Sequence, residues 1–279
     1  MGRDRVKGVH MHQVIVNTNT YHGYSLDEAI EEISKLGFKE VELTATIGWT
    51  EHVYPTFEFK ELLRLKNKLK DYQLEVVGMS GHSNLMDSDR LNDFKNNIHL
   101  AKFFNAKYIV SSIGEAHIED KEHKTEDELV ENIKSLVPTL EETGLMLVLE
   151  VHGDDHGTGQ IIQQIVEKVH SDKVKIAYDT ANAIFYGDVD IFEDIENTID
   201  DIAYIHLKDK SGEKREWNFP AIGKGDIDFE RLFKLLDKYN KQLPISIEIE
   251  FTNEGPNDIE EINQALKDSK EELERLNIL

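Results

Sequence analysis

The amino-acid sequence predicts an α/β protein with a single (β/α)8 barrel, forming one domain over residues 1–279. Short apolar segments alternate with amphipathic segments along the chain, this pair recurs eight times, and no Pro-rich or Ser/Gly-rich linker interrupts the series. Such alternation favours a parallel sheet covered by helices. Eight units in about 250 residues fit a closed barrel better than a doubly wound open sheet.

The expected elements follow one another in a regular order. The strands cover residues 9–16, 39–44, 74–80, 107–113, 145–151, 173–179, 202–208 and 244–251, and the helices after them cover 25–37, 59–72, 90–104, 126–144, 159–170, 189–199, 228–239 and 259–273. Gly37 and Gly144 stand where the first and the fourth helix should stop before the next strand begins. Glycine is favoured there because it adopts the left-handed conformation that ends many helices.

Composition excludes several classes of function. The chain has 55 acidic and 32 basic residues, a formal charge of -23, which repels phosphodiester backbones and disfavours nucleic acid as a partner. It contains no cysteine, so a disulfide framework and a thiol nucleophile are both excluded. The first ten residues lack the apolar stretch of a signal peptide, and no apolar run reaches membrane-spanning length. We therefore expect a cytoplasmic protein with no membrane partner.

Alternation within the later strands indicates which side chains face the barrel axis. In the last strand Ile245, Ile247 and Ile249 share one face, which must pack against helices, so Glu248 points inward and Glu250 lies one step nearer the rim. The same count turns four side chains of consecutive strands toward the axis, near the strand ends: Glu150, Asp179, His206 and Glu248.

Barrel enzymes carry their active sites at this carboxyl end, which suggests a shared role for the four residues. One strand-end glutamate alone would be read as a solvated rim residue, but recurrence at the same depth in four strands favours a metal site. Three carboxylates and an imidazole would repel one another without a cation. Oxygen and nitrogen ligands without sulfur suit Mn²⁺, Mg²⁺, Co²⁺ or Zn²⁺, and the excess of carboxylates favours one Mn²⁺ ion.

Five motifs resemble the xylose isomerase-like TIM barrels, the sugar phosphate isomerase/epimerase group that includes ketose 3-epimerases, inosose dehydratases and the AP endonuclease branch. They are LEVHG at 149–153, YDTAN at 178–182, HLKD at 206–209, GKGDIDF at 223–229 and SIEIE at 246–250. The resemblance implies metal ligands after strands five to eight, which become Glu150, Asp179, His206 and Glu248. Of these, Glu248 is chosen over Glu250. The resemblance also implies a possible homodimer.

The chain departs from the endonuclease branch of that family. The endonuclease branch resembles a design with three zinc ions, in which a histidine stands three residues after the strand-six aspartate. This chain has Asn182 at that position. The fourth strand ends in Ser111 and Ser112 and supplies no histidine. A metal cluster and phosphodiester cleavage are therefore not expected. Asn182 either hydrogen-bonds a substrate hydroxyl or caps the following helix.

These residues suggest a mechanism on a small sugar substrate. A cation that bridges a carbonyl and its neighbouring hydroxyl acidifies the adjacent C–H and stabilises an enediolate. Glu150 and Glu248, on opposite sides, are the predicted catalytic carboxylates that remove and return the proton. The expected activity is isomerisation or epimerisation of a ketose or related polyol ketone. The alternatives are a dehydratase of a keto-polyol and a sugar-binding barrel without catalysis, although the latter should have lost a ligand.

A second set of residues near the mouth is expected to bind the substrate: His82, Glu115, His152, Asn182, Lys208 and Trp217. For His82 a purely structural role is the competing interpretation. Glu42 also faces inward and is expected to orient a ligand or a hydroxyl. The long loop 208–226 is interpreted as a lid. Its basic residues either anchor a phosphate or carboxylate or lie in solvent among acidic neighbours: Lys208, Lys210, Lys214, Arg215 and Lys224.

Overall fold

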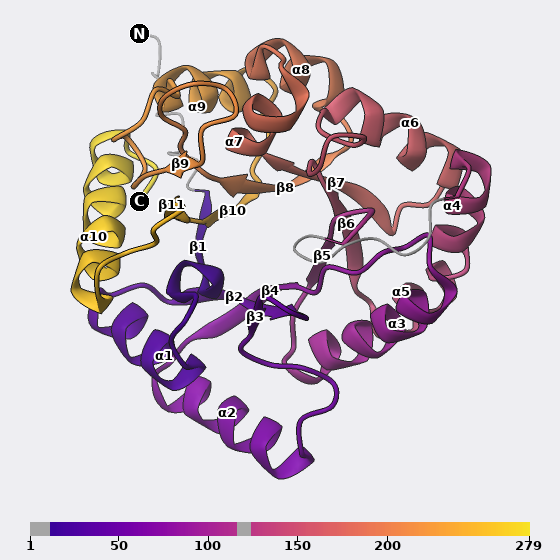
Figure 1. Cartoon of the computed structure of the whole chain (residues 1–279), viewed down its shortest axis with the longest axis horizontal. Coiled ribbons are helices and arrows are strands. Elements are labelled where there is room, and N and C mark those ends of the chain that lie inside the picture. Colours follow the sequence, from indigo (N-terminus) through magenta and orange to yellow (C-terminus); the bar gives the residue numbers. More distant parts are fainter. Residues whose placement is uncertain (1–11, 116–123) are drawn as a thin grey trace, which may run out of the picture.

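A computed structural model describes residues 12–115 and 124–279, and within these ranges eight parallel strands close into a barrel surrounded by helices (Figure 1). Closure is explicit in the pairing, because β1 pairs in parallel with both β2 and β10. The predicted fold class is therefore confirmed. The first ten residues, on which the expectation of no signal peptide depends, lie outside the described residues. The start of the first predicted strand lies outside them as well.

Each barrel strand lies within or beside a predicted segment. The strands are β1 (Gln13–Asn17), β2 (Glu40–Thr46), β4 (Glu75–Ser80), β5 (Tyr108–Ser111), β6 (Met146–Glu150), β7 (Val174–Asp179), β8 (Ile202–Leu207) and β10 (Pro244–Ile247). Three short strands lie outside this barrel order: β3 (Thr50–Glu51) pairs antiparallel with β2, and β9 (Asn218–Phe219) pairs antiparallel with β11 (Phe251–Thr252).

The outer layer consists of helices that bury one apolar face against the strands. They are α1 (Leu26–Lys35), α2 (Phe59–Asp71), α3 (Ser88–Phe103), α4 (Glu126–Lys134), α5 (Val137–Thr143), α6 (Gly159–Val169), α8 (Ile191–Thr198), α9 (Phe229–Lys238) and α10 (Ile259–Arg275). Short turns follow β1 and β7: η1 (Thr18–Tyr21), α7 (Thr180–Asn182) and η2 (Ala183–Gly187). Among the described residues, no helix combines the length and the apolar character needed to span a bilayer.

The prediction of one helix over 126–144 was wrong, since α4 and α5 are separate helices. Pro138 lies in the first turn of α5, where its missing N–H costs no helical hydrogen bond. In the middle of a continuous helix the same proline would remove a hydrogen bond and collide with the preceding turn. The chain therefore starts a new helix at this point.

Strand alternation was predicted correctly at the strand ends but not throughout. The barrel interior is filled by a layer of apolar side chains: Ile15, Val77, Val110, Val148, Ala177 and Tyr204. Counting back in twos from Ser80 would turn Val76 inward, but Val76 belongs to the helix-facing core. Counting back from His206 would turn Ala203 outward, but Ala203 packs against the interior layer. Both exceptions sit where the strand register shifts by one residue, between β2 and β4 and between β7 and β8.

The loop after β8 is organised by one buried carboxylate. Asp209 accepts hydrogen bonds from the backbone N–H groups of Lys210 (2.8 Å), Gly223 (2.9 Å), Gly225 (2.8 Å) and Ile227 (3.3 Å). A Cβ atom at Gly225 would lie 2.3 Å from an Asp209 oxygen, so this position requires glycine. Together with the β9–β11 pair, these bonds hold the loop over the carboxyl ends of the strands.

Candidate active site

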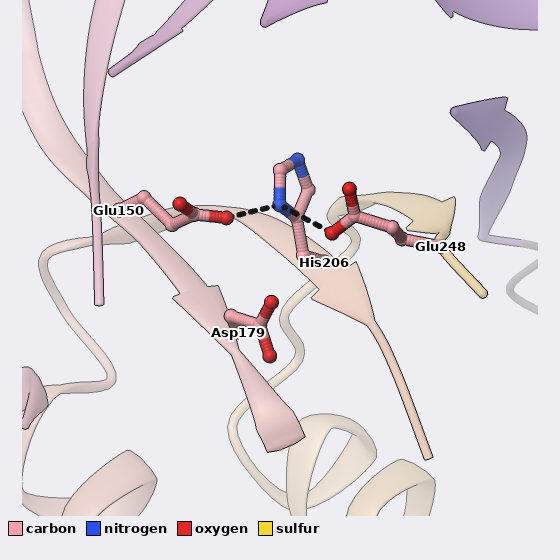
Figure 2. A group of neighbouring side chains, drawn as sticks. All are labelled: Glu150, Asp179, His206 and Glu248. Atoms are coloured by element: carbon pink, nitrogen blue, oxygen red, sulfur yellow. Dashed lines mark hydrogen bonds and ion pairs between the residues drawn. The ribbon is translucent and has the colours of Figure 1, made fainter. Parts of the chain in front are cut away.

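Four buried side chains from consecutive barrel strands meet at the carboxyl end of the barrel (Figure 2). Glu150 and Asp179 are the last residues of β6 and β7, His206 is the second-last residue of β8, and Glu248 directly follows β10. Each offers one ligand atom, and these atoms all lie within 4.8 Å of one another. We call these four residues the carboxylate–histidine group. Their convergence is what strand alternation predicted.

The group attracts positive charge. His206 Nδ1 lies 2.6 Å from Glu150 Oε1 and 3.6 Å from Glu248 Oε2, and Figure 2 shows the two glutamates approaching the ring from opposite sides. Burial opposes the charged imidazole, but Glu42 and Glu150 raise the pKa of His206 well above its usual value. Burial likewise opposes the ionised form of Glu150, yet His206 and His82 hold its pKa below the usual value. Glu150 is therefore an ionised carboxylate.

Asp179 provides the test of whether the group fits a divalent cation. Its Oδ1 accepts hydrogen bonds from the N–H groups of Ala181 (2.9 Å) and Asn182 (2.8 Å), while its buried Oδ2 accepts none among the described residues. Burial raises the pKa of Asp179 to about 8; Lys208 opposes this shift, and Glu150 and Glu248 add to it. A buried carboxylate oxygen without a donor, crowded by like charges, fits a cation ligand.

Glu42, which the sequence predicts to orient a ligand, contacts the His206 ring at the nitrogen that does not face the group. Both oxygens of Glu42 lie 3.1 Å from His206 Nε2, which leaves Nδ1 facing the other ligands. Glu42 is itself held by the hydroxyl of Tyr204 at 2.8 Å and by that of Ser80. Metal-bound histidines commonly have such a partner, which fixes the orientation and the tautomer of the ring.

Lys208 and Glu250 form a buried ion pair at the rim of the group. The Lys208 ammonium contacts a Glu250 oxygen and lies 3.5 Å from Glu248 Oε2 and 3.9 Å from Asp179 Oδ2. Burial opposes its charge, but Glu248, Glu250 and Asp179 raise its pKa well above the usual value. The structure thus places Glu248 within the group and pairs Glu250 with the lysine, and Glu248 as the ligand in place of Glu250 stays a prediction.

Above the group lies a small cavity, the inner compartment, of about 20 Å³. Five of the six predicted substrate-binding residues border it, as do Glu150 and Glu248. Its lining is Asn19, Thr44, Thr46, Trp49, Ser80, His82, Glu150, His152, Asn182, Tyr186, Lys208, Trp217, Glu248 and Glu250.

Three more side chains of this lining are placed to contact a ligand: His82, His152 and Asn182. His82 Nδ1 accepts a hydrogen bond from Ser112 N (2.9 Å) and lies 3.8 Å from Glu150 Oε2. Burial lowers the pKa of His152 to about 4, so its ring is neutral. The Asn182 side chain makes no capping bond to η2, which removes the capping alternative and leaves contact with a ligand as its predicted role.

Glu115 does not join the site. Its carboxylate pairs with Arg90, through Nε and through NH2 at 3.2 Å, and it borders neither the inner compartment nor the group. Glu115 lies four residues beyond the end of β5, and no pattern in the sequence indicates that Arg90 on α3 binds its carboxylate. Its predicted role in substrate binding is therefore not supported by its position.

The predicted anion anchor on loop 208–226 is not assembled either. Lys210 is buried and donates to the carbonyls of Ser211 and Glu213, whereas Lys214, Arg215 and Lys224 pair with acidic residues outside the loop. Lys214 lies 3.0 Å from Asp188, Arg215 2.6 Å from Asp154, and Lys224 3.6 Å from Asp268. Of the five basic side chains, only Lys208 borders the inner compartment.

Sequence reasoning missed the polar residues that follow β1. Asn19 Nδ2 donates to Glu248 Oε1 (2.9 Å) and to Glu250 Oε1 (3.3 Å), and Asn19 Oδ1 accepts from Trp49 Nε1 (3.0 Å). The run NTNTY at 17–21, directly after an apolar strand, was an available signal. Trp49 lies in the loop after β2, where strand alternation makes no prediction.

A sequence model of the xylose isomerase-like TIM barrel family matches residues 30–276 of the chain. The chain belongs to this family. The resemblance stated from the five motifs is thereby confirmed, and the match covers nearly the whole barrel.

Curated relatives of this xylose isomerase-like barrel are named inosose dehydratase. The protein of Clostridium perfringens is 27% identical over 184 residues, which cover 60% of this chain and 58% of the relative, so the match spans less than two thirds of that protein's length. The protein of Geobacillus kaustophilus is 26% identical over 262 residues, covering 81% of this chain and 80% of the relative.

Solved structures with the same fold include sugar epimerases. A D-psicose 3-epimerase solved in the presence of D-fructose has a TM-score of 0.75 at 17% identity, covering 96% of this chain and 100% of the other. The D-psicose 3-epimerase of Clostridium cellulolyticum H10, solved with D-tagatose, has a TM-score of 0.76 at 14% identity, covering 95% and 99%. A xylose isomerase-like barrel of Mycobacterium smegmatis, solved with magnesium, has a TM-score of 0.75 at 14% identity, covering 97% and 98%. These likenesses show the fold.

Proposed function

We propose that the protein is a divalent-metal-dependent sugar isomerase or epimerase that acts on a ketose or a related polyol ketone. The observation that carries the proposal is the carboxylate–histidine group, with an Asp179 oxygen that accepts no hydrogen bond from the described residues and with its excess of negative charge. The names of solved epimerases with this fold agree with it. Mn²⁺ is the proposed ion because carboxylates dominate the ligand set, and Mg²⁺, Co²⁺ and Zn²⁺ fit the same donor types.

Glu150, Asp179, His206 and Glu248 would hold the ion. When bound, it polarises the sugar carbonyl and lowers the pKa of the neighbouring C–H, which stabilises an enediolate of the sugar. Glu150 is ionised and accepts the proton, and Glu248, on the other side of His206, returns a proton to the opposite face or the adjacent carbon. His82, His152 and Asn182 orient hydroxyl groups, while Lys208 offers its ammonium to an oxygen that gains charge.

Dehydration is the second candidate function, because the curated relatives are named inosose dehydratase. Both reactions begin with removal of the same type of proton, and they diverge only when a hydroxyl leaves the adjacent carbon instead of a proton returning. The same site therefore supports both, and the product distinguishes them by the mass of one water molecule.

Solvent exchange tests the proposed function. We expect the Mn²⁺-loaded protein, incubated with ketoses and an inosose in D₂O, to exchange the proton beside the carbonyl of at least one of them, as followed by proton NMR. Protein stripped with a chelator should show no exchange. Conversion without loss of water supports the epimerase or isomerase, and a product lighter by one water supports the dehydratase. Absence of exchange across the whole panel would contradict both.

A further inference from the structure

A second, larger cavity adjoins the inner compartment at the two tryptophans of the chain. This outer compartment, of about 520 Å³, is bounded by residues 249–256, Asn19, Thr20, His22, Trp49 and Trp217. Trp49 and Trp217, together with Asn19 and Glu250, border both cavities. The chain has only these two tryptophans, so both lie at one junction.

The outer compartment cannot hold the reacting carbonyl. None of the four residues of the carboxylate–histidine group borders it. Its volume falls in the range of cavities that enclose small organic ligands. A ligand that fills the outer compartment must therefore extend outward from the unit that meets the group.

Both tryptophan rings are held in place before any ligand arrives. The His22 ring stacks on Trp49 with centroids 3.9 Å apart and planes 11° apart, and the Trp49 N–H donates to Asn19 Oδ1 at 3.0 Å. Trp217 packs edge-on against Phe219 at 5.0 Å and Phe185 at 5.8 Å. Because Asn19 also donates to Glu248, the Trp49 platform is tied to the group itself.

The lining of the outer compartment indicates the chemistry of its ligand. The lining includes two indole rings and neutral polar side chains such as Thr20, Thr252 and Asn253, while its charged side chains are the carboxylates of Glu250 and Glu254. No lysine or arginine borders this cavity in the described part of the chain. Aromatic faces accept the C–H faces of a sugar ring, and amides and hydroxyls meet its hydroxyl groups. A phosphate would meet acidic groups without a cation to bind it.

We propose that the substrate is an uncharged ketose or polyol ketone that carries a second sugar ring, and that this ring binds in the outer compartment between Trp49 and Trp217. This inference rests on the proposed function, because the first unit must present its carbonyl to the carboxylate–histidine group. It goes beyond that function by assigning a second subsite and by excluding phosphorylated sugars as preferred substrates.

Three ketoses that differ only at C6 test the substrate class: D-fructose, isomaltulose, which carries a glucosyl ring there, and fructose 6-phosphate. We expect kcat/KM for proton exchange with Mn²⁺-loaded protein to be at least about tenfold higher for isomaltulose than for D-fructose, and lowest for the phosphate. A preference for fructose 6-phosphate, or equal values for fructose and isomaltulose, would overturn the inference while leaving the proposed function intact.

Tryptophan fluorescence gives a readout that does not require turnover, since both emitters line the cavity. Isomaltulose should shift the emission of the metal-loaded protein at a concentration at least about tenfold below that needed for D-fructose. If no ketose exchanges protons, this binding difference alone decides the subsite. A clear difference supports the second subsite while the proposed function fails, and equal or absent binding of the two sugars overturns the subsite.

Two substitutions test where the second ring binds. Trp49→Ala should lower the isomaltulose-to-fructose ratio of binding constants at least about fivefold. Phe59→Ala is the control, because it removes an aromatic ring that is 67% exposed and outside both compartments, and it should leave the ratio as in the wild type. Thr252→Phe, on the rim of the outer compartment, should lower the same ratio by obstruction if Trp49→Ala does not fold. An unchanged ratio in a folded Trp49→Ala or Thr252→Phe variant would overturn the inference.

Discussion

Glu150→Gln is expected to abolish sugar conversion, with a fall in rate of roughly a hundredfold to ten-thousandfold, the usual contribution of a positioned base. The glutamine keeps an oxygen toward the group but cannot accept a proton. Glu150 is ionised in the structure and lies 2.6 Å from His206 Nδ1, so its replacement also removes one charge from the group. The measurement is the conversion rate on a ketose that the wild type accepts, with the metal content of each preparation determined in parallel.

Glu248→Gln extends this test, because two carboxylates on opposite sides should not fail in the same way. Both variants should block conversion, but one should retain solvent exchange, since a single remaining base can remove and return a proton on its own side. Glu115→Gln is the matched control. Its carboxylate pairs with Arg90 away from the group, and conversion should stay near the wild-type rate. Near-normal conversion by Glu150→Gln with its metal bound would contradict the assigned role.

Lys208→Met is expected to destabilise the metal-free protein by about 3 kcal/mol, since breaking a buried ion pair leaves charges without a partner. The lysine is almost fully buried and lies within 4 Å of oxygens of Glu250, Glu248 and Asp179. Its removal leaves their mutual repulsion unopposed. Loading with Mn²⁺ should recover much of the loss, because an ion present at 100 times its Kd adds about 2.7 kcal/mol to the folded state. Urea denaturation with and without Mn²⁺ measures both free energies of unfolding.

Lys224→Met is the control for that experiment. Lys224 is 59% exposed and lies 3.6 Å from Asp268, so its loss should change the free energy of unfolding by less than about 0.5 kcal/mol. A Lys208→Met protein as stable as this control, and insensitive to Mn²⁺, would show that Lys208 does not balance the carboxylates of the site.

The sequence predicted the positions that depend on strand periodicity. In a parallel barrel every strand carries its end to the same rim, so a count of alternating residues was enough to bring Glu150, Asp179 and His206 together. The count failed inside β4 and β8, where one extra residue shifts the register and exchanges the faces of Val76 and Ala203. A bulge leaves no mark on the pattern of apolar residues, because both exchanged side chains are apolar.

Positions that depend on contacts between loops were beyond such reasoning. Glu115 pairs with Arg90 instead of facing the site. In loop 208–226, basic residues pair with acidic residues that are distant in the sequence, such as Asp154 and Asp268. Trp49 and Trp217 meet at one junction although 168 positions separate them. The order of the strands predicts that their loops share a rim, but not which side chains meet there. The homodimer that the family resemblance implies stays a prediction.

Metal content tests the central claim most directly. Wild-type protein and Asp179→Asn are equilibrated with Mn²⁺, desalted in parallel, and analysed by elemental mass spectrometry. We expect about one ion per chain in the wild type and almost none in the variant, since Asp179 provides a buried oxygen that accepts no hydrogen bond from the described residues. Equal Mn²⁺ in both proteins, or none in the wild type, would contradict a metal site built from these four residues.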